Sequence, residues 1–286
     1  MYKRQPQTPI ILYSHNLIKP YAPGQIIKMS DKDALVFTSD EEQENTKQPK
    51  GKSKNSRASK PSKQGKAEPK NSKSLNVRST GFKEFLLRPE LEKAIGDAGF
   101  EHPSEIQQEA IPVAVYGKDL ICQANSGMGK TAVFVLSVLH QLDVDASPFQ
   151  CLVLCHTREL AHQISREFER LGKYIVGLRI QSIYGGVKID KQIAKLEMLP
   201  PHIIIGTPGR TLHLVKEKKL PLDGLRFFII DECDRVLEQF DMRQTVQEIF
   251  VKTKPKKQVC MFTATLNGKT KETCMKFLKK VFEILL

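Results

Sequence analysis

The sequence lacks the paired cysteines of zinc sites and redox motifs, and it lacks any long apolar run. Its six cysteines form no Cys-x-x-Cys pair, and most of them lie in short apolar stretches. We therefore expect buried free thiols in a reducing compartment rather than disulfides. No apolar run approaches the roughly 20 residues that a membrane span needs. We expect a soluble intracellular protein without a membrane segment.

Acidic residues are nearly missing from residues 46–78, which carry 11 lysines or arginines and a single acid, Glu68. This segment supplies most of the net charge of +13. Its Lys/Ser/Pro/Asn composition buries too little apolar surface to offset the entropy of an ordered chain. The sequence predicts a disordered tail over residues 1–78 and a folded domain over residues 79–286. The basic run could serve nuclear localisation or RNA tethering, or it could be a solvated linker, and the composition leaves both open.

Beyond the tail, apolar runs of strand length alternate with stretches of helical period. The expected strands are 119–123, 151–155, 179–184, 202–205, 226–230, 258–262 and 282–286, and the expected helices are 89–97, 104–116, 131–142, 158–173, 189–198, 211–218, 242–251 and 269–279. Such alternation predicts right-handed crossovers and a mostly parallel sheet with helices on both faces, which is an α/β fold.

A glycine-rich loop separates the first expected strand from the helix that follows it. It reads Ala124-Asn125-Ser126-Gly127-Met128-Gly129-Lys130-Thr131. The glycines let backbone N–H groups converge on phosphate, Lys130 can reach the outer phosphates, and the Thr131 hydroxyl can bind Mg²⁺. The strict pattern has glycine in place of Ala124. A glycine-rich turn that happens to precede Lys-Thr is the alternative, and the strand-loop-helix context argues against it.

Two acids, Asp231 and Glu232, directly follow the expected strand 226–230. A carboxylate at the end of a buried strand is costly unless it meets a cation, so Asp231 is predicted to bind Mg²⁺ together with Thr131. Glu232 is predicted to be the general base that acts on the attacking water. Alternatively the acids cap the helix expected near Arg235, a role that suits Asp234. With Lys130 as the third catalytic residue, the motifs predict a nucleoside-triphosphate site.

At this point the sequence resembles the DEAD-box RNA-dependent ATPases over roughly residues 79–286. The stretch Gly99-Phe100-Glu101-His102-Pro103-Ser104-Glu105-Ile106-Gln107 resembles the adenine-reading motif of that family. The resemblance implies a RecA-like P-loop NTPase domain, ATP as the nucleotide, and adenine contacts from Gln107 and Phe82. As alternatives, Phe82 could be a core residue and Gln107 a surface glutamine.

Three further loops resemble the RNA-contacting motifs of the same family. They are Thr157-Arg158-Glu159, the doublet Gly185-Gly186, and Thr207-Pro208-Gly209-Arg210. His156 stands where most members have proline. In the family these loops grip the backbone of single-stranded RNA, which implies binding that tolerates many sequences. Thr263-Ala264-Thr265 resembles the motif that couples hydrolysis to unwinding, with Thr263 in place of the usual serine.

Cys233, in Asp231-Glu232-Cys233-Asp234, resembles the DECD branch of the family. That branch acts in spliceosome assembly and nuclear mRNA export, which implies splicing or export proteins as partners and a nuclear location, with the cytoplasm as a second location. A metal role for Cys233 is the alternative, but no thiol or imidazole lies at ligand spacing in the nearby sequence, so a small buried thiol is expected.

The second RecA-like domain of the family, with its arginine-rich last motif, is missing from the sequence. Because an arginine finger contributes on the order of 10³–10⁵ in rate, we expect slow hydrolysis by this chain. Two functions follow. The chain is either the N-terminal half of an ATP-dependent RNA helicase, or a non-catalytic ATP- and RNA-binding module that occupies partners.

Overall fold

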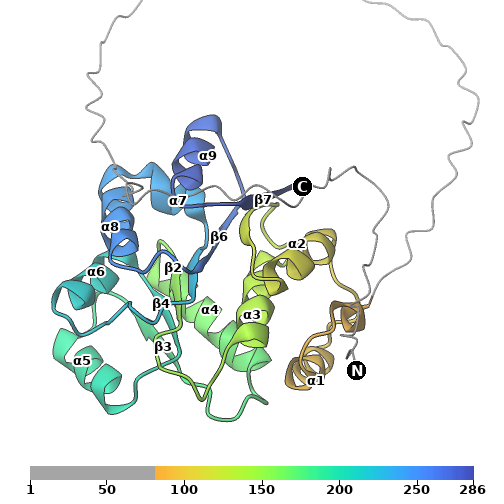
Figure 1. Ribbon diagram of the computed structural model, residues 1–286, viewed down its shortest axis with the longest axis horizontal. Helices are drawn as coiled ribbons and strands as arrows, with labels where there is room; N and C mark the ends of the chain where they lie inside the picture. Colours follow the sequence, from red (N-terminus) through yellow and green to blue (C-terminus); the bar gives the residue numbers. More distant parts are fainter. Residues whose placement is uncertain (1–80) are drawn as a thin grey trace, which may run out of the picture. The chain divides into compact units, whose positions relative to one another are not determined.

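The computed structural model describes residues 81–286, and the predicted tail over residues 1–78 lies outside them. Within residues 81–286, one sheet has the strand order β3-β4-β2-β5-β6-β1-β7 (Figure 1). All neighbouring strands in it are parallel. The strands are β1 (Asp119–Gln123), β2 (Cys151–Leu154), β3 (Ile180–Ile183), β4 (Ile203–Gly206), β5 (Phe227–Ile230), β6 (Gln258–Thr263) and β7 (Val281–Leu285).

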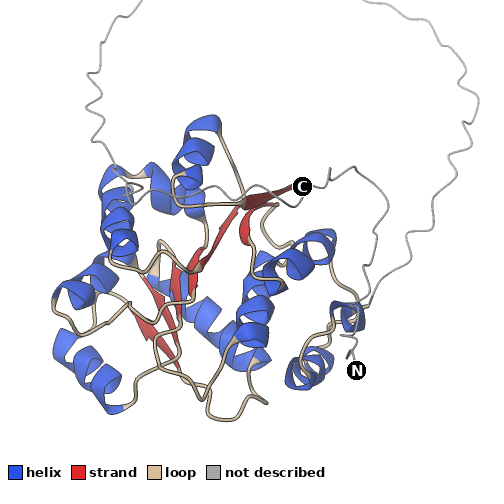
Figure 2. Ribbon diagram, in the orientation of Figure 1, coloured by secondary structure: helices blue, strands red, loops and turns tan. Residues whose placement is uncertain are grey.

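Helices cover both faces of this sheet, as the alternating pattern predicted (Figure 2). They are a 3-10 helix (Phe82–Phe85), α1 (Pro89–Asp97), α2 (Glu105–Val115), α3 (Lys130–Gln141), α4 (Arg158–Leu171), α5 (Ile189–Met198), α6 (Pro208–Lys216), α7 (Cys233–Glu238), α8 (Phe240–Val251) and α9 (Gly268–Met275). One hydrophobic core joins the sheet to α1–α4, and the other joins it to α5–α9. In β1, Leu120 and Cys122 belong to the first core and Ile121 to the second, because successive side chains of a strand point to opposite faces. Two covered faces explain why these strands are apolar without alternation.

The seven predicted strands are all confirmed, and two helices, α1 and α5, have the predicted ends. By contrast, α6 begins at Pro208 rather than at residue 211, because proline fits the first turn of a helix, where its missing N–H costs nothing. The helix predicted over 269–279 ends at Met275. After the helix, the Lys279 backbone N–H donates to Asp119 Oδ2 (3.0 Å), just before the chain enters β7. The 3-10 helix was not predicted, since four residues are too short to show a period.

The loops that follow the strands lie at one edge of the sheet, because parallel strands all end on the same side. The three strands β3, β4 and β2 are neighbours, and they lead into residues 185–186, 207–210 and 157–159. The next three, β5, β6 and β1, lead into residues 231–232, 263–265 and 124–131. The predicted RNA loops therefore share one half of this edge, and the predicted nucleotide loops share the other half.

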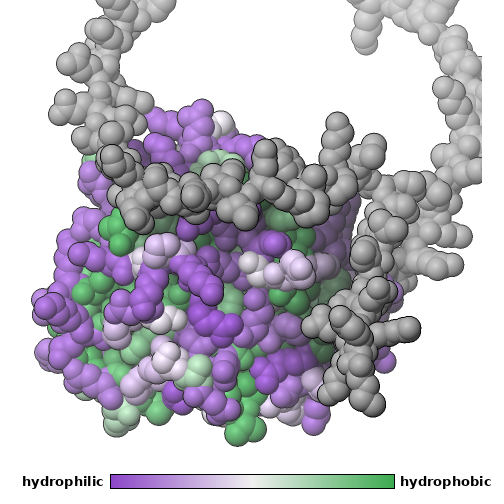
Figure 3. Space-filling view, viewed as in Figure 1, coloured by the Kyte–Doolittle hydropathy of each residue, from purple (hydrophilic) through white to green (hydrophobic). Residues whose placement is uncertain are grey.

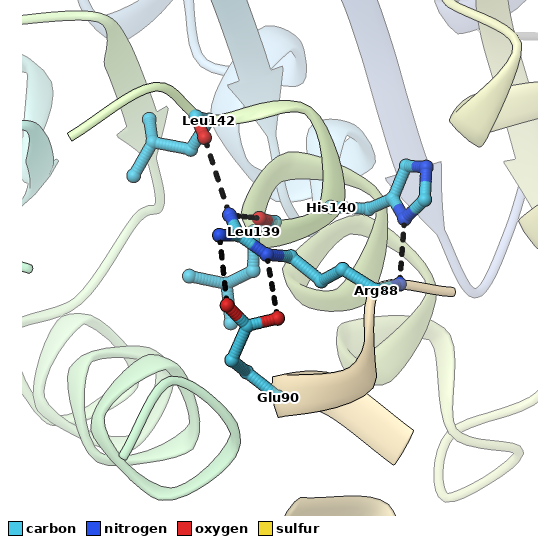
Figure 4. A network of polar contacts seen from close by, with 5 residues as sticks. All are labelled: Arg88, Glu90, Leu139, His140 and Leu142. Carbon is cyan, nitrogen blue, oxygen red and sulfur yellow. Dashed lines mark hydrogen bonds and ion pairs between the residues drawn. The ribbon is translucent and has the colours of Figure 1, made fainter. Parts of the chain in front are cut away.

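Arg88 fixes α1 to the end of α3, the helix that follows the phosphate loop (Figure 4). Its guanidinium pairs with Glu90 (3.2 Å) and donates to the Leu139 and Leu142 carbonyls (3.4 Å each). The Arg88 backbone N–H donates to His140 Nδ1 (3.2 Å). Carbonyls at the last turn of a helix have no partner within it, so Arg88 satisfies groups that would otherwise stay unpaired.

None of the helices within residues 81–286 has the length and apolar character that crossing a bilayer requires. On the face drawn in Figure 3, hydrophilic residues predominate and hydrophobic ones are scattered among them.

Candidate functional site

The phosphate loop takes its shape from two glycines that adopt the left-handed conformation. Gly127 has φ 84° and Gly129 has φ 85°, and Gly129 is the N-cap residue of α3. A Cβ at Gly129 would lie 2.3 Å from Gln107 Nε2, so a side chain there would also displace Gln107. Ala124, which departs from the strict pattern, is fully buried, and its φ is not positive. Alanine fits at position 124 because no left-handed backbone is needed there.

Lys130 lies folded back over the loop that precedes it. Its Nζ donates to the carbonyl oxygens of Ala124 (2.5 Å) and Asn125 (3.0 Å). The same loop leads into the N-terminus of α3, where the first N–H groups of a helix have no partner within it. The arrangement provides one positive side chain and several backbone donors around a curved loop, which fits a phosphate chain.

Gln107 connects α2 to the phosphate loop, and only 6% of it is exposed. Its Oε1 accepts from the Ser104 backbone N–H (3.0 Å), and its Nε2 donates to the Gly129 carbonyl (3.2 Å). Ser104 adds a second link, since its hydroxyl donates to the Met128 carbonyl (2.7 Å). The alternative of a surface glutamine is therefore wrong. The amide that was predicted to read adenine borders the phosphate loop directly.

Phe82 is 6% exposed and stacks on Phe100, with 5.7 Å between the ring centroids. Phe85 contacts the Phe82 ring edge-on. This environment supports the alternative of a core position, and an adenine contact by Phe82 stays a prediction.

Asp231 ends β5 as a buried carboxylate, with 4% of the residue exposed. Its backbone N–H donates to the Leu154 carbonyl of β2 (3.0 Å), and its Oδ1 accepts from the Glu232 N–H (3.0 Å). Burial raises the pKa of Asp231 to about 6, and Lys130 opposes this rise. A buried carboxylate with a raised pKa gains most from a cation, so Asp231 fits a metal ligand.

Glu232 has a strained backbone and a half-buried side chain. Its φ of 50° and ψ of 52° are left-handed, which is costly for a residue with a Cβ. Its Oε2 lies 3.1 Å from His156 Nδ1 at the end of β2. Although Glu232 is the N-cap residue of α7, its side chain makes no capping bond, so the capping alternative is wrong for it.

Asp234 lies inside α7 and does not cap it, which makes the capping alternative wrong here as well. Its Oδ2 accepts from the Thr265 hydroxyl (2.8 Å), while its Oδ1 is buried without a partner among the described residues. The Thr263 hydroxyl donates to the Thr265 carbonyl (2.7 Å). The two threonines that were predicted to couple hydrolysis to unwinding are thus attached to the helix that follows Asp231 and Glu232.

The three predicted RNA loops are joined by hydrogen bonds from two arginines. Arg158 donates to the Gly185 carbonyl (3.4 Å), and Arg210 donates to the Val187 carbonyl (2.9 Å) and to Gln192 Oε1 (2.7 Å). The Thr157 hydroxyl caps α4 by accepting from the Leu160 N–H (3.1 Å). Arg158, Glu159, Gly186 and Gly209 are exposed, whereas Pro208 is buried. These loops form one connected surface with free backbone groups and positive charge, which suits a phosphate backbone.

All six cysteines are buried free thiols, as predicted. Cys274 of α9 lies against Cys233, with 3.7 Å between the sulfur atoms, and this neighbour was not visible in the sequence. No group of three or more potential metal ligands occurs within residues 81–286. The interpretation of Cys233 as a small buried thiol is therefore confirmed for the described part of the chain.

A hollow of about 450 Å³ lies beside α7, α8 and α9, and no residue of the phosphate loop lines it. The sequence interpretation did not include Ser104, Asp234 or His156 among the site residues. His156 could have been noticed from the sequence, because it stands where most members of the DEAD-box family have proline.

Comparisons with known proteins agree with this geometry. Residues 104–273 match the family described as DEAD/DEAH box helicase. The chain is 55% identical over 210 residues to DEAD-box ATP-dependent RNA helicase 56 of Oryza sativa subsp. japonica, covering 73% of this chain and 49% of the relative. It is 54% identical over 212 residues to DEAD-box ATP-dependent RNA helicase 15 of Arabidopsis thaliana, with the same coverage. The chain thus spans about half the length of these curated relatives.

Two solved structures show the same RecA-like fold. S. cerevisiae Dbp5 bound to RNA and ADP BeF3 superimposes with a TM-score of 0.66 at 29% identity, covering 72% of this chain and 52% of that one. A DEAD box protein from Methanococcus jannaschii superimposes with a TM-score of 0.68 at 32% identity, covering 72% of this chain and 55% of that one.

Proposed function

This chain belongs to the DEAD/DEAH box helicase family, and we propose that it is the ATP-binding and RNA-contacting half of an ATP-dependent RNA helicase. The observation that carries the proposal is the division of one sheet edge into two adjoining halves. The phosphate-binding loop follows β1, the threonine-bearing loop 263–265 follows β6 and the acidic residues follow β5, while the glycine- and arginine-bearing loops follow β2, β4 and β3. The site is then able to hold a nucleotide beside a nucleic-acid strand.

On the nucleotide half, each side chain has a role that its position supports. The loop N–H groups and Lys130 would bind the phosphates, and Gln107 would contact the adenine edge. Thr131 and the buried Asp231 would hold Mg²⁺, whose charge stabilises the transferring phosphate when it is bound. Glu232 would orient the attacking water and accept its proton. Asp234 and Thr265 connect this half to residues 263–265.

On the RNA half, the exposed backbone groups and arginines of the loops favour the sugar–phosphate backbone of single-stranded RNA, with little dependence on base identity. S. cerevisiae Dbp5, which superimposes on this chain, has been solved with RNA bound, and this supports the assignment. Cys233 and His156 support membership of the DECD branch, and with it a nuclear role beside splicing or export proteins.

RNA-stimulated ATP hydrolysis by the full 286-residue chain tests the proposal. We expect slow turnover that rises with single-stranded RNA and disappears in Lys130→Ala. Lys216→Ala is the matched control, because Lys216 pairs with exposed Glu248 on α8 and is not part of the carboxyl edge. Binding of ATP and RNA without any turnover would instead support the non-catalytic module. A chain that binds neither ligand would contradict both functions.

A further inference from the structure

The two halves of the site meet where β2 and β5 lie side by side. Leu154 of β2 pairs with Ile230 of β5, and the Asp231 N–H donates to the Leu154 carbonyl (3.0 Å). Two residues beyond this pair lie His156, which precedes the RNA loop 157–159, and Glu232, the general base of the proposed function. This boundary is the place where an RNA contact can reach a hydrolytic residue most directly.

His156 and Glu232 touch across this boundary. His156 Nδ1 lies 3.1 Å from Glu232 Oε2, and the two side chains are 28% and 41% exposed. The Nδ1 atom is buried, and it forms no hydrogen bond of regular geometry within residues 81–286. Glu232 Oε2 lies within ion-pair distance of Nδ1, although the pair does not form a regular hydrogen bond. Such a contact is weak and easily broken.

Glu232 depends on its surroundings to stay where it is. Its left-handed backbone is sparsely populated for residues other than glycine, and such conformations persist only where neighbours maintain them. The carboxylate forms no other ion pair or hydrogen bond among the described contacts. A change at His156 is consequently able to alter the position of this carboxylate.

His156 in turn is fixed to the RNA loops. On one side, the Cys155 N–H donates to the Gly206 carbonyl of β4 (3.1 Å), and Cys155 Sγ donates to the Thr157 carbonyl (3.5 Å). On the other side, Thr157 caps α4 and Arg158 donates to Gly185. These bonds connect His156 to residues 157–159 and 185–186, the loops predicted to contact RNA.

We propose that His156 is a positioning residue that holds the Glu232 carboxylate aside in the RNA-free chain and releases it when RNA engages residues 157–159. The inference rests on the proposed function, in which Glu232 is the base and residues 157–159 contact RNA. Proline, the usual residue of the family at this position, has no polar side-chain atom and cannot make this contact. The contact suppresses hydrolysis in the RNA-free chain. RNA binding breaks the contact and so allows Glu232 to take its position as the base.

Linkage gives the size of the effect. If RNA binding breaks the contact, the contact stabilises only the RNA-free state. A variant without the contact must then bind RNA more tightly, by the same factor by which the contact stabilises that state. Partly exposed ion pairs correspond to about 1.4- to 5-fold in an equilibrium constant. We therefore expect a coupling of that size between positions 156 and 232, measured as RNA affinity in the absence of nucleotide.

A double-mutant cycle on the full chain tests the coupling. The probe is a fluorescent oligouridylate, and the variants are His156→Ala, Glu232→Ala and the double variant. We expect the double variant to tighten RNA binding by less than the product of the two single effects, by about 1.4- to 5-fold. His156→Asn keeps a donor near the place of Nδ1 and should stay close to the unmutated chain. His213→Ala and Glu217→Ala form the matched control cycle, because this exposed pair (4.0 Å) lies at the C-terminal end of α6.

Histidine ring NMR supplies a signature that a purely structural role would not give. The His156 resonance is the one lost in His156→Asn, which also keeps the fold testable if the alanine variant is unstable. We expect this resonance to shift on addition of the oligouridylate and to be shifted already, without RNA, in Glu232→Ala. A cycle in which the effects simply multiply, or a His156 resonance unchanged at RNA saturation, overturns the inference and leaves the proposed function standing. Absence of RNA binding by the unmutated chain overturns both.

Discussion

Replacement of Asp231 by asparagine is expected to stabilise the ligand-free chain. Asp231 is 4% exposed, and burial raises the pKa of its carboxyl from 3.8 to about 6. The folded chain therefore binds the proton more tightly than the unfolded chain does. Where the two states differ in protonation, the free energy of unfolding falls as pH rises. The penalty is absent below about pH 3.8, develops between about pH 3.8 and about pH 6, and persists above that range.

The magnitude follows from the same values. The difference between 3.8 and about 6, at about 1.4 kcal/mol for each pH unit, gives a penalty of about 3 kcal/mol near neutral pH. Asparagine has nearly the same shape, and its Oδ1 can still accept from the Glu232 N–H, so the variant avoids the penalty without losing that bond. For a domain of this size, about 3 kcal/mol corresponds to a rise of about 6–12 °C in Tm.

Thermal unfolding followed by circular dichroism measures this effect, because the chain has no tryptophan to report it. Asp231→Asn should raise Tm at about pH 7.5, and about half of the gain in free energy should remain at about pH 5. Mg·ATP should stabilise the unmutated chain more than the variant, since Asp231 is the proposed metal ligand. An equal Tm for both chains at about pH 7.5, or a gain that does not decrease toward acid pH, would refute the assignment of Asp231 as an ionised, uncompensated carboxylate.

Three further predictions concern the phosphate loop and the tail. Gln107→Ala should lower the free energy of unfolding by about 1 kcal/mol through the lost capping box, and should reduce the preference for ATP over GTP in a binding titration. Equal ATP and GTP affinities in the unmutated chain would contradict that role of Gln107. Gly129→Ala should abolish nucleotide binding, whereas Gly127→Ala, with a similar φ but no atom within 4 Å of the new Cβ, should weaken it less. Equal losses would show that contact with Gln107 is unimportant. Deletion of residues 46–78 should weaken RNA binding and reduce its salt dependence, and an unchanged salt slope would exclude a contribution of the tail.

The fold was largely accessible from the sequence because its signals are local. Apolar strand-length runs such as residues 203–205 and 227–230 can be identified without knowledge of their neighbours, and a strand-helix alternation has few compatible topologies. Local signals also identified Lys130, Thr131 and Asp231. Their predicted roles in binding phosphate and Mg²⁺ follow from residue type and from their positions shortly after a strand. The start of α6 was less accessible, because Pro208 is compatible with both a loop and a first helical turn.

Contacts between distant segments could not be predicted from the sequence. Gln107 lies 22 positions before Gly129, and their hydrogen bond depends on how α2 packs beside α3. The proximity of Cys233 to Cys274 and of His156 to Glu232 depends on side-chain placement in the assembled sheet. The strained backbone of Glu232 has no sequence signal either, because glutamate is not a residue that favours left-handed conformations.

The central claim is that one sheet edge holds a nucleotide half and an RNA half with separate binding residues. Separate titrations of the full chain with Mg·ATP and with a single-stranded oligouridylate test it most directly, in the unmutated chain, Lys130→Ala and Arg158→Ala. The account predicts that Lys130→Ala loses ATP and keeps RNA, and that Arg158→Ala keeps ATP and binds RNA more weakly, with a salt slope smaller by about one. Loss of both ligands in either folded variant, or loss of neither, would contradict it.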